Sequence, residues 1–378
     1  MSFKNALVGD GFKVPPNYDH LPTSDLLTNG LVADLPYPGM PSYSPIGAPV
    51  LHSIERQLQT ALSNCGYVQV ELPSLVSDSD LHAGDSVGPQ FASKLLAVSN
   101  LPGYHLLSTP EMLFTRLFRT KLRSYRDLPL RRSYTASFFR RAPAMKALLI
   151  CRQFRIVGIA AMELDSVGVL ASLNAAVDAC TAVLSSLGVE TVHLNGGEAA
   201  RLEMCYPTTE GDIWIGSAEN RSRALSLGIG YEYASGSRLP IRYRNAANRN
   251  SSPRMATFGL CSNRALHCVF DACRDQWGFA LPRSVKPYDA VVIPRGTSSA
   301  TRAVRVSAEL QSAGLRVGLD DRYSMATTVR QSFAHYIGAD AAIVVAEDDV
   351  RWDACRGRSR DGEAARLDGL VDTIVDRN

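Results

Sequence analysis

Three adjacent residues in the first third of the chain have the chemistry to hold a small charged molecule. Thr109, Pro110 and Glu111 place a hydroxyl and a carboxylate two positions apart at the start of a helical pattern. Together these groups suit the capture of an ammonium or imino group by charge-assisted hydrogen bonds. Taken alone, the triplet is more typical of an ordinary helix start, so its meaning depends on its neighbours.

A strongly basic segment follows this triplet. Between positions 116 and 141 the chain carries nine basic residues and a single acidic one, Asp127. The nine are Arg116, Arg119, Lys121, Arg123, Arg126, Arg131, Arg132, Arg140 and Arg141. Such a run could neutralise the phosphates of ATP or RNA, although charge alone favours a solvated basic helix face.

The spacing of apolar residues predicts an α+β domain around these stretches, after an extended arm at residues 1–45 that is rich in Pro, Gly, Asn and Ser. Helical spacing predicts helices, and alternating or β-branched stretches predict strands. The expected helices are Val50–Leu62, Pro110–Arg123, Val167–Leu187 and Ala265–Trp277. The expected strands are Tyr67–Pro73, Ser133–Phe139, Leu148–Val157, Thr191–Leu194, Arg238–Tyr243 and Met255–Leu260.

A different pattern begins after the proline-bearing stretch Leu281–Pro287. Strand, helix, strand, helix and strand alternate there, an order typical of an α/β unit with a parallel sheet. These elements are expected at Tyr288–Pro294, Ala300–Ala313, Arg316–Leu319, Met325–Ile337 and Ala341–Ala346. We therefore predict an α+β domain at 46–284 and an α/β domain at 285–378, which ends in a charged tail with one short helix at Ala364–Ile374.

The overall composition is ordinary for a globular protein, with 46% hydrophobic and 20% charged residues among 378. No uninterrupted apolar run reaches the roughly 18–20 residues of a membrane span, and the first residues lack the pattern of a signal peptide. We expect no membrane segment and a cytoplasmic location. The eight cysteines form no C-x-x-C pair, which favours reduced core thiols over a disulfide or zinc site, and we expect no metal ligands.

In its order of motifs, the sequence resembles class II aminoacyl-tRNA synthetases of the prolyl type over residues 36–350. Pro38–Gly47, the helix at Val50–Leu62 and the stretch Gly66–Pro73 are similar to the family's entry loop and first motif. In that family the helix and strand of this motif form a subunit interface. The resemblance therefore implies a homodimer.

The most specific likeness runs from Leu107–Glu111 to Ser124–Leu130, where the chain reads Ser-Tyr-Arg-Asp-Leu-Pro-Leu. Prolyl enzymes carry a T-x-E loop, a helix and an S-Y-R-x-L-P stretch in this order. The resemblance implies that Thr109 and Glu111 bind the amino-acid substrate, which would be proline or an analogue.

The family's second and third motifs also have counterparts. Phe139–Ala142 and Arg152–Phe154 resemble the second motif, and Phe258–Arg264 resembles the third. The resemblance implies ATP and Mg²⁺ as cofactors. It further implies that Arg140 contacts both the amino acid and the α-phosphate, and that Arg264 holds the γ-phosphate. A fixed guanidinium is suited to charge that builds up on phosphate oxygens. The catalytic residues implied are Arg140 and Arg264, and the ATP-binding residues are Arg140, Arg152, Gln153, Ser262 and Arg264.

Towards the C-terminus, Val285–Pro294 and Gly318–Arg322 resemble the anticodon-binding domain shared by the prolyl, threonyl, histidyl and glycyl enzymes. The fold implied is a class II catalytic domain, with an antiparallel sheet and flanking helices, followed by an α/β anticodon-binding-like domain. Transfer of the activated amino acid to tRNA or to another acyl acceptor would then complete the reaction.

Several motif positions depart from the family pattern. Ala142 and Gln153 replace two glutamates of the second motif, and Cys261 replaces a glycine of the third. The region Gly211–Gly236, with a weak signal at Gly216–Arg221, aligns only loosely, and about 100 residues between the second and third motifs leave no room for a large editing insertion. The chain therefore resembles a shortened, divergent paralogue.

Two functions remain open from the sequence. The first is ATP-dependent activation of an amino acid as its adenylate, followed by transfer to tRNA or another acceptor. The second is a catalytically inactive, synthetase-like binding or regulatory protein, which the altered motif residues favour.

Overall fold

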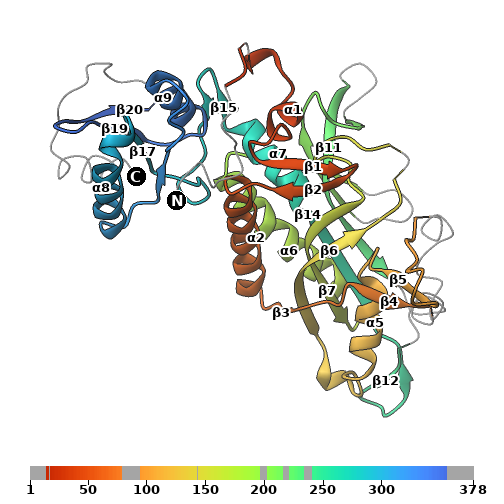
Figure 1. Cartoon of the computed structure of the whole chain (residues 1–378). Helices are drawn as coiled ribbons and strands as arrows, with labels where there is room; N and C mark the ends of the chain where they lie inside the picture. Colours follow the sequence, from red (N-terminus) through yellow and green to blue (C-terminus); the bar gives the residue numbers. More distant parts are fainter. Residues whose placement is uncertain are drawn as a thin grey trace. The chain divides into compact units, whose positions relative to one another are not determined.

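Figure 1 shows a computed structural model of the chain. The structure describes residues 14–16, 18–78, 94–142, 144–195, 202–215, 221–233 and 241–355. Some expectations lie wholly or partly outside these residues, namely the weak signal at Gly216–Arg221 up to residue 220, the strand at Arg238–Tyr243 up to residue 240, and the helix at Ala364–Ile374. The chain divides into two compact units. We call the one made of Leu35–Pro41 and Ile54–Cys268 the core unit, and the one made of Met1–Asp34, Ser42–Ser53 and Val269–Asn378 the second unit.

The core unit is built on an eight-stranded sheet. Its strand order is β3-β6-β7-β14-β11-β9-β8, and β10 pairs with β11. The described pairings are antiparallel except that of β3 with β6. The strands are β3 (Val68–Val70), β6 (Leu130–Phe139), β7 (Gln153–Glu163), β8 (Val192–Asn195), β9 (Leu202–Pro207), β10 (Ile213–Ile215), β11 (Ser222–Tyr233) and β14 (Arg254–Cys261). A mainly antiparallel sheet, as expected, is confirmed.

Two helices of the core unit, α5 (Glu111–Arg119) and α6 (Ser166–Ser186), contact this sheet. The α6 helix starts after Asp165, whose carboxylate accepts the backbone N–H of Gly168 at 2.9 Å. By length and composition alone, α6 could span a membrane. It packs on β7, β11 and β14, however, and its apolar residues are needed there, so we interpret α6 as a core helix.

Strand β7 is buried along most of its length because both of its faces are covered. Ala160 and Met162 join an apolar cluster with Phe114 of α5 and Phe138 of β6. The intervening residues face the other side of the sheet, and they are fully buried as well. At Gly158 the packing leaves no room for a side chain. A Cβ there would lie 2.5 Å from both the Phe258 carbonyl oxygen and the Tyr134 hydroxyl.

The second unit contains a four-stranded sheet in the order β18-β17-β19-β20, with helices α8 (Ala300–Ser312) and α9 (Thr327–Tyr336). The central strand β17 (Ala290–Pro294) is parallel to both β18 (Val317–Leu319) and β19 (Ala341–Val345). The predicted α/β arrangement is therefore confirmed. One strand was missed, since β20 (Val350–Ala354) pairs antiparallel with β19 where a charged tail was expected.

The Asp-Asp-Arg sequence after β18 forms a buried ion pair in this unit. Both Asp320 and Arg322 are almost completely inaccessible to solvent, and their Oδ2 and Nη2 atoms are 2.5 Å apart. The Arg322 guanidinium also lies 4.3 Å from the centre of the Phe333 ring, and Arg330 donates to the Asp320 carbonyl at 3.0 Å. These contacts give the sequence a structural role within the unit.

The N-terminal part has more regular structure than the arm predicted from composition. It contains η1 (Tyr18–His20), α1 (Thr23–Leu27), β1 (Ala33–Tyr37) and β2 (Met40–Tyr43), and α2 (Gly47–Asn64) follows as expected.

The remaining elements are β4 (Leu75–Ser77), β5 (Tyr104–Leu106), η2 (Tyr125–Asp127), β12 (Tyr243–Arg244), β13 (Asn250–Ser251), α7 (Ser262–Ala272), β15 (Arg274–Asp275), β16 (Gly278–Phe279) and η3 (Thr297–Ser299).

Several predicted boundaries were wrong, among them the helix expected at Pro110–Arg123, which ends at Arg119, and the strand expected at Tyr67–Pro73, which covers Val68–Val70. The strand expected at Leu148–Val157 begins at Gln153, because residues 146–150 form a turn in which Lys146 and Ile150 exchange backbone hydrogen bonds. Of the described part of the strand expected at Arg238–Tyr243, only Tyr243 lies in a strand, the two-residue β12 (Tyr243–Arg244). The helix expected to reach Trp277 ends at Ala272.

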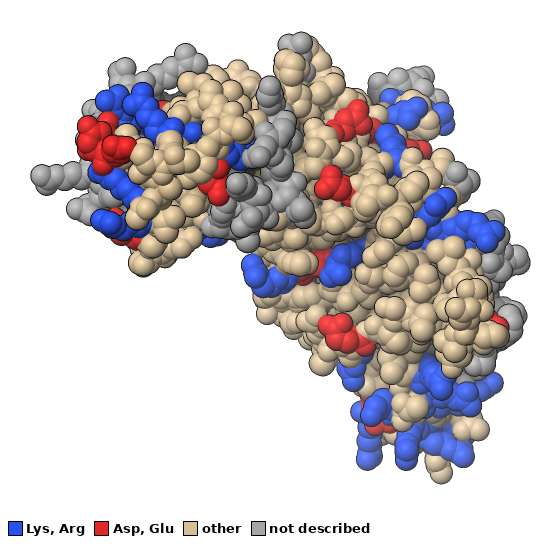
Figure 2. Space-filling model, viewed as in Figure 1, with Lys and Arg blue, Asp and Glu red and all other residues tan. Residues whose placement is uncertain are grey.

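The basic segment lies on the surface of the core unit. Six of its nine basic residues are exposed, and the other three, Arg131, Arg132 and Arg140, are half-buried. Figure 2 shows blue side chains gathered over the part of the molecule that Figure 1 labels α5 and β12.

Candidate functional site

The carboxylate of Glu111 is the most constrained group among the expected site residues. Glu111 begins α5 and is only 7% exposed. Its Oε2 atom accepts a hydrogen bond from the Thr109 hydroxyl, and its Oε1 atom accepts one from the Thr257 hydroxyl at 3.3 Å. The structure thus brings Thr109 and Glu111 together and adds a third residue, Thr257, that the sequence did not identify.

Two tyrosines of β11 lie beside this carboxylate. In the β11–β14 register, Tyr231 is directly opposite Thr257, and Tyr233 is on the same face of β11 because strand side chains alternate. Burial raises the pKa of Tyr233, and the charge of nearby Glu111 raises it further. The same two causes raise the pKa of Tyr231. Both phenols therefore stay protonated near neutral pH and can donate hydrogen bonds.

Arg140 supplies a positive charge near the carboxylate. It follows directly after β6, its Nε donates to the Ser108 carbonyl at 3.0 Å, and its guanidinium lies 5.1 Å from the centre of the Phe154 ring. Burial lowers the pKa of Arg140, and Glu111 makes the largest opposing contribution. Arginine stays charged even so. An anionic and a cationic group in one half-buried cluster can bind both ends of a zwitterion such as an amino acid.

Arg152 and Gln153 are fixed through their backbones at the start of β7. Their N–H groups both donate to the Gly39 carbonyl, at 2.8 and 3.0 Å, and the Arg152 carbonyl accepts the Arg140 N–H at 2.8 Å. Gly39 has a φ of +74°, and a Cβ on it would lie 2.9 Å from the Arg152 nitrogen. A side chain at position 39 would therefore disturb the Arg152 backbone, which is hydrogen-bonded to that of Arg140.

The guanidinium of Arg264, at the start of α7, is held by main-chain carbonyls. Its Nε donates to Leu149 at 2.8 Å and its Nη1 to Ser226 at 2.6 Å. Its Nη2 lies 3.8 Å from Asp212. Ser262, two residues earlier, is completely buried. The structure thus gives Arg264 a role in joining three segments of the core unit, besides any contact with a ligand.

A bidentate ion pair supports the strand that carries Arg152 and Gln153. Arg155 of β7 donates to both carboxylate oxygens of Glu55 on α2, at 2.7 and 2.8 Å. The Arg155 backbone N–H also donates to the Asn263 side chain at 2.9 Å. Because Glu55 is 5% exposed, this pair fixes the position of β7 more firmly than a solvated surface pair would.

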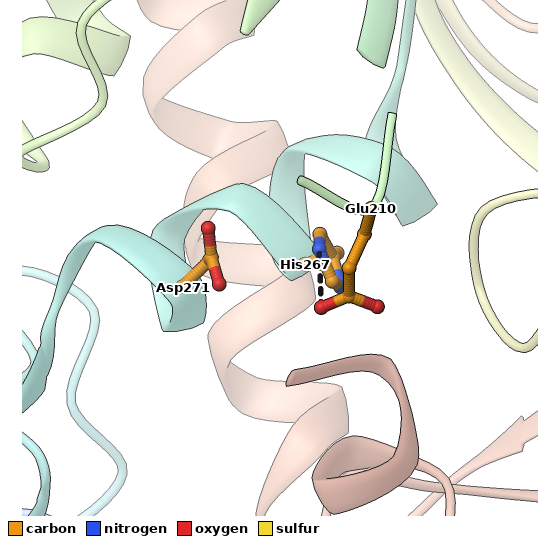
Figure 3. Close-up of side chains that lie close together, drawn as sticks. All are labelled: Glu210, His267 and Asp271. Carbon is orange, nitrogen blue, oxygen red and sulfur yellow. Dashed lines mark ion pairs between the residues drawn. The ribbon is translucent and has the colours of Figure 1, made fainter. Parts of the chain in front are cut away.

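One further cluster lies around α7. His267 is fully buried, and its Nε2 is 3.9 Å from the Glu210 carboxylate. Figure 3 shows these two side chains facing each other, with Asp271 one turn further along α7. Sequence reasoning named no metal ligand here, although these residue types can bind divalent cations. Asp271 accepts a hydrogen bond from the Thr23 hydroxyl at 2.6 Å, which already engages its carboxylate.

Comparison with known proteins shows which family this region is similar to. Residues 99–272, which contain Thr109, Glu111, Arg140 and Arg264, match the family model "tRNA synthetase class II core domain (G, H, P, S and T)". Over these residues the chain is similar to the class II tRNA synthetase core, and its resemblance to the prolyl members of this class, expected from the sequence, is confirmed.

Several of the similar proteins are proline–tRNA ligases. The relative from Lachnospira eligens is 25% identical over 293 residues, covering 74% of this chain and 60% of that protein. The relative from Bifidobacterium animalis is 26% identical over 194 residues, covering 50% of this chain and 31% of that protein. The chain thus spans less than two thirds of either relative. Among solved structures, prolyl-tRNA synthetase from Giardia lamblia in complex with prolyl-adenylate matches 92% of this chain and 72% of its own, at 19% identity and a TM-score of 0.73.

Proposed function

We propose that this protein activates proline or a proline analogue with ATP, forming an aminoacyl-adenylate. One observation carries the proposal. The buried Glu111 carboxylate accepts hydrogen bonds from Thr109 and Thr257 and interacts electrostatically with Arg140. Keeping an ionised carboxylate buried is costly unless it has a charged partner. Arg140 is one such partner, and a bound imino or ammonium group would provide a second. The prolyl-adenylate bound to the Giardia lamblia structure supports the choice of substrate.

In this reaction a carboxylate oxygen of the amino acid attacks the α-phosphorus of ATP. A new P–O bond forms, the bond to the β-phosphate oxygen breaks, and pyrophosphate leaves with its electron pair. Glu111 would hold the substrate nitrogen, and Arg140 would neutralise charge on the α-phosphate and the acyl oxygen. Arg152, Gln153, Ser262 and Arg264 are proposed to lie against the rest of the nucleotide. Mg²⁺, bound to the ATP phosphates, would reduce repulsion between them.

The activated amino acid would then pass to tRNA or to another acyl acceptor. We further propose that the second unit acts as an anticodon-binding-like domain and that α2 and β3 contribute to a homodimer interface. Light scattering coupled to size-exclusion chromatography tests the dimer directly. A monomer at micromolar concentration would contradict this part of the proposal without affecting the chemistry.

The test of the activity is amino-acid-dependent exchange of pyrophosphate into ATP, measured across a panel of amino acids with proline first. The proposal predicts exchange with one amino acid, and its loss in Arg140→Ala. Arg132→Ala provides a matched control, because Arg132 is also a half-buried arginine of the β6 region. Absence of exchange with every amino acid, in a folded protein, would contradict the proposal.

A second function is favoured by specific observations on the nucleotide side. Ala142 carries no carboxylate, and the Arg264 guanidinium is held by the carbonyls of Leu149 and Ser226. Both features suit a catalytically inactive protein that keeps the scaffold to bind a partner or regulate one. Calorimetric titration with Mg²⁺-ATP distinguishes the two. Saturable binding that Arg264→Ala abolishes would argue against the inactive form.

A further inference from the structure

Two segments far apart in the sequence form one basic surface on the core unit, which we call the basic tip. The first segment comprises the last turns of α5 and the residues up to η2, and the second is the β12–β13 hairpin. The basic tip contains eight basic residues: Arg116, Arg119, Lys121, Arg123, Arg126, Arg242, Arg244 and Arg249. All eight are exposed. Figure 2 shows Lys and Arg side chains gathered over the part of the molecule that Figure 1 labels α5 and β12.

The two segments are held together by backbone contacts. The N–H of Arg244 donates to the carbonyl of Arg123 at 2.8 Å, and Ser124 and Arg244 form a parallel β-bridge. Within the hairpin, the Asn245 side chain accepts the N–H groups of Ala247 and Arg249, at 3.0 and 2.9 Å. The arginines of the hairpin are therefore fixed beside those of the helix.

The charge of the tip is almost entirely of one sign. Neither residues 116–126 nor residues 242–249 include an acidic residue. Asp127 directly follows the first segment. Its carboxylate accepts the backbone N–H groups of Arg123 and Ser124, at 2.9 and 2.8 Å, and so caps the start of η2. Eight cations this close repel one another, and that repulsion lowers the stability of the fold. A polyanion bound on the tip would relieve it.

The side chains around these cations favour RNA over a lipid surface. Arginine binds phosphate oxygens in a bidentate manner. Tyr125 is half-buried beside Arg126, whose guanidinium lies 5.7 Å from the centre of its ring. Exposed amides at Asn248 and Asn250 could bond to sugars or bases. Binding to a membrane surface would instead need an apolar face, and Leu117, at 45% exposed, is the large exposed apolar residue of the two segments.

We infer that the basic tip binds the phosphate backbone of an RNA. The inference deepens the proposed function and rests on it for the choice of RNA, since it assigns the surface on which an RNA acceptor would be held. The tip and the candidate site share α5. Arg119 is eight residues from Glu111, or about 12 Å along the helix axis, so substitutions at the tip leave the carboxylate cluster intact.

The test is binding of a short fluorescein-labelled RNA hairpin, followed by fluorescence anisotropy over a range of salt concentrations. The variant Arg119→Gln/Arg123→Gln/Arg249→Gln removes three positive charges in total, two from the first segment and one from the hairpin. We expect it to weaken binding by about 30-fold or more near 0.1 M salt, and to lower the slope of log affinity against log salt by about 2 to 3. The corresponding Arg→Lys triple variant should retain most of the binding.

A matched control removes three exposed positive charges elsewhere on the core unit, in Arg56→Gln/Lys94→Gln/Arg221→Gln. We expect this variant to bind RNA within about threefold of the unaltered protein. Equal losses in the two Gln variants would overturn the inference. The inference would also be overturned if the unaltered protein bound phosphatidylserine vesicles as tightly as RNA and the tip variant lost that vesicle binding. If the triple variant does not fold, Lys121→Gln/Arg242→Gln tests the same surface.

Pyrophosphate exchange, measured on the same samples, separates this inference from the proposed function. We expect exchange to be unchanged in the tip variant. Loss of RNA binding with no exchange in any sample would contradict the adenylate chemistry and leave the RNA surface supported. Exchange with no RNA binding by the unaltered protein would contradict the RNA surface alone.

Discussion

The two halves of the candidate site differ in how far they keep the chemistry of a class II core. On the amino-acid side, Glu111 is buried, accepts hydrogen bonds from Thr109 and Thr257, and lies close to the charge of Arg140. On the nucleotide side, Ala142 lacks a carboxylate and Arg264 is held by carbonyls of its own chain. The residues that we propose to bind the amino acid therefore match the family pattern more closely than those that we propose to bind ATP.

The largest effect is expected at the centre of the amino-acid side. Glu111→Gln keeps the shape of the side chain but removes the charge that would hold the substrate nitrogen. We expect amino-acid-dependent pyrophosphate exchange to fall by about 100- to 1000-fold, because the lost group is a charge-assisted partner in a buried site. Glu203→Gln, a half-buried carboxylate on neighbouring β9, is the control. An equal fall in pyrophosphate exchange in both variants would show that Glu111 has no special role among the carboxylates of the core unit.

The next largest effect concerns the nucleotide side, and it is one of stability. Arg264→Gln would leave the carbonyls of Leu149 and Ser226 without their donors. We expect the free energy of unfolding to drop by about 2 to 3 kcal/mol, measured by chemical denaturation. Arg141→Gln, at an exposed arginine of the same unit, should change it by less than about 0.5 kcal/mol. An unchanged stability for Arg264→Gln would mean that its carbonyl contacts matter little, and would favour a role in ATP binding.

A smaller effect is expected at Thr257. Thr257→Val removes one buried hydrogen bond to Glu111 while keeping the volume of the side chain. We expect the KM for the amino acid to rise by about tenfold, which corresponds to about 1.4 kcal/mol, with the KM for ATP unchanged. Thr135→Val, on β6, is the comparison variant. An equal rise in the KM values for the amino acid and for ATP in Thr257→Val would show that the amino-acid side and the nucleotide side of the site do not act independently.

The smallest effect is expected from restoring a missing group. Ala142→Glu reintroduces the carboxylate that the family pattern has on the nucleotide side. If that side limits the reaction, exchange should increase by a few-fold, or about 1 kcal/mol, and the KM for ATP should fall. A decrease would indicate that the loop around position 142 has been rebuilt for another purpose.

The sequence predicted the elements that carry a strong periodic signal. The helices near α2, α6 and α8 were found because their apolar residues recur at helical spacing and a glycine ends each pattern, as Gly188 does after α6. Strand β11 was missed. Its alternation is interrupted by Gly228 and Gly230, and its pairing with β9 shifts register between Ser226 and Gly228. A pattern of period two fails at such an irregularity.

The candidate site was predictable only as far as contiguous motifs reached. Thr109, Glu111 and Arg140 lie in stretches with a family likeness, and the structure brings them close to one another. Tyr231, Tyr233 and Thr257 were not identified, because their proximity to Glu111 depends on the pairing of β11 with β14. That pairing joins residues about 25 positions apart through side-chain packing, and no local pattern reports it. Likewise, only the fold brings the arginines of the β12–β13 hairpin beside those of α5.

The absence of space at Gly158 has a consequence for how this protein can evolve. A Cβ there would meet both the Phe258 carbonyl and the Tyr134 hydroxyl, so the smallest change at this position would push β7 and β14 apart. Ala142, at a motif position, already differs from the family pattern. Among descendants of a common ancestor, we therefore expect catalytic positions to diversify while this glycine persists, and it would mark distant relatives after their chemistry has diverged.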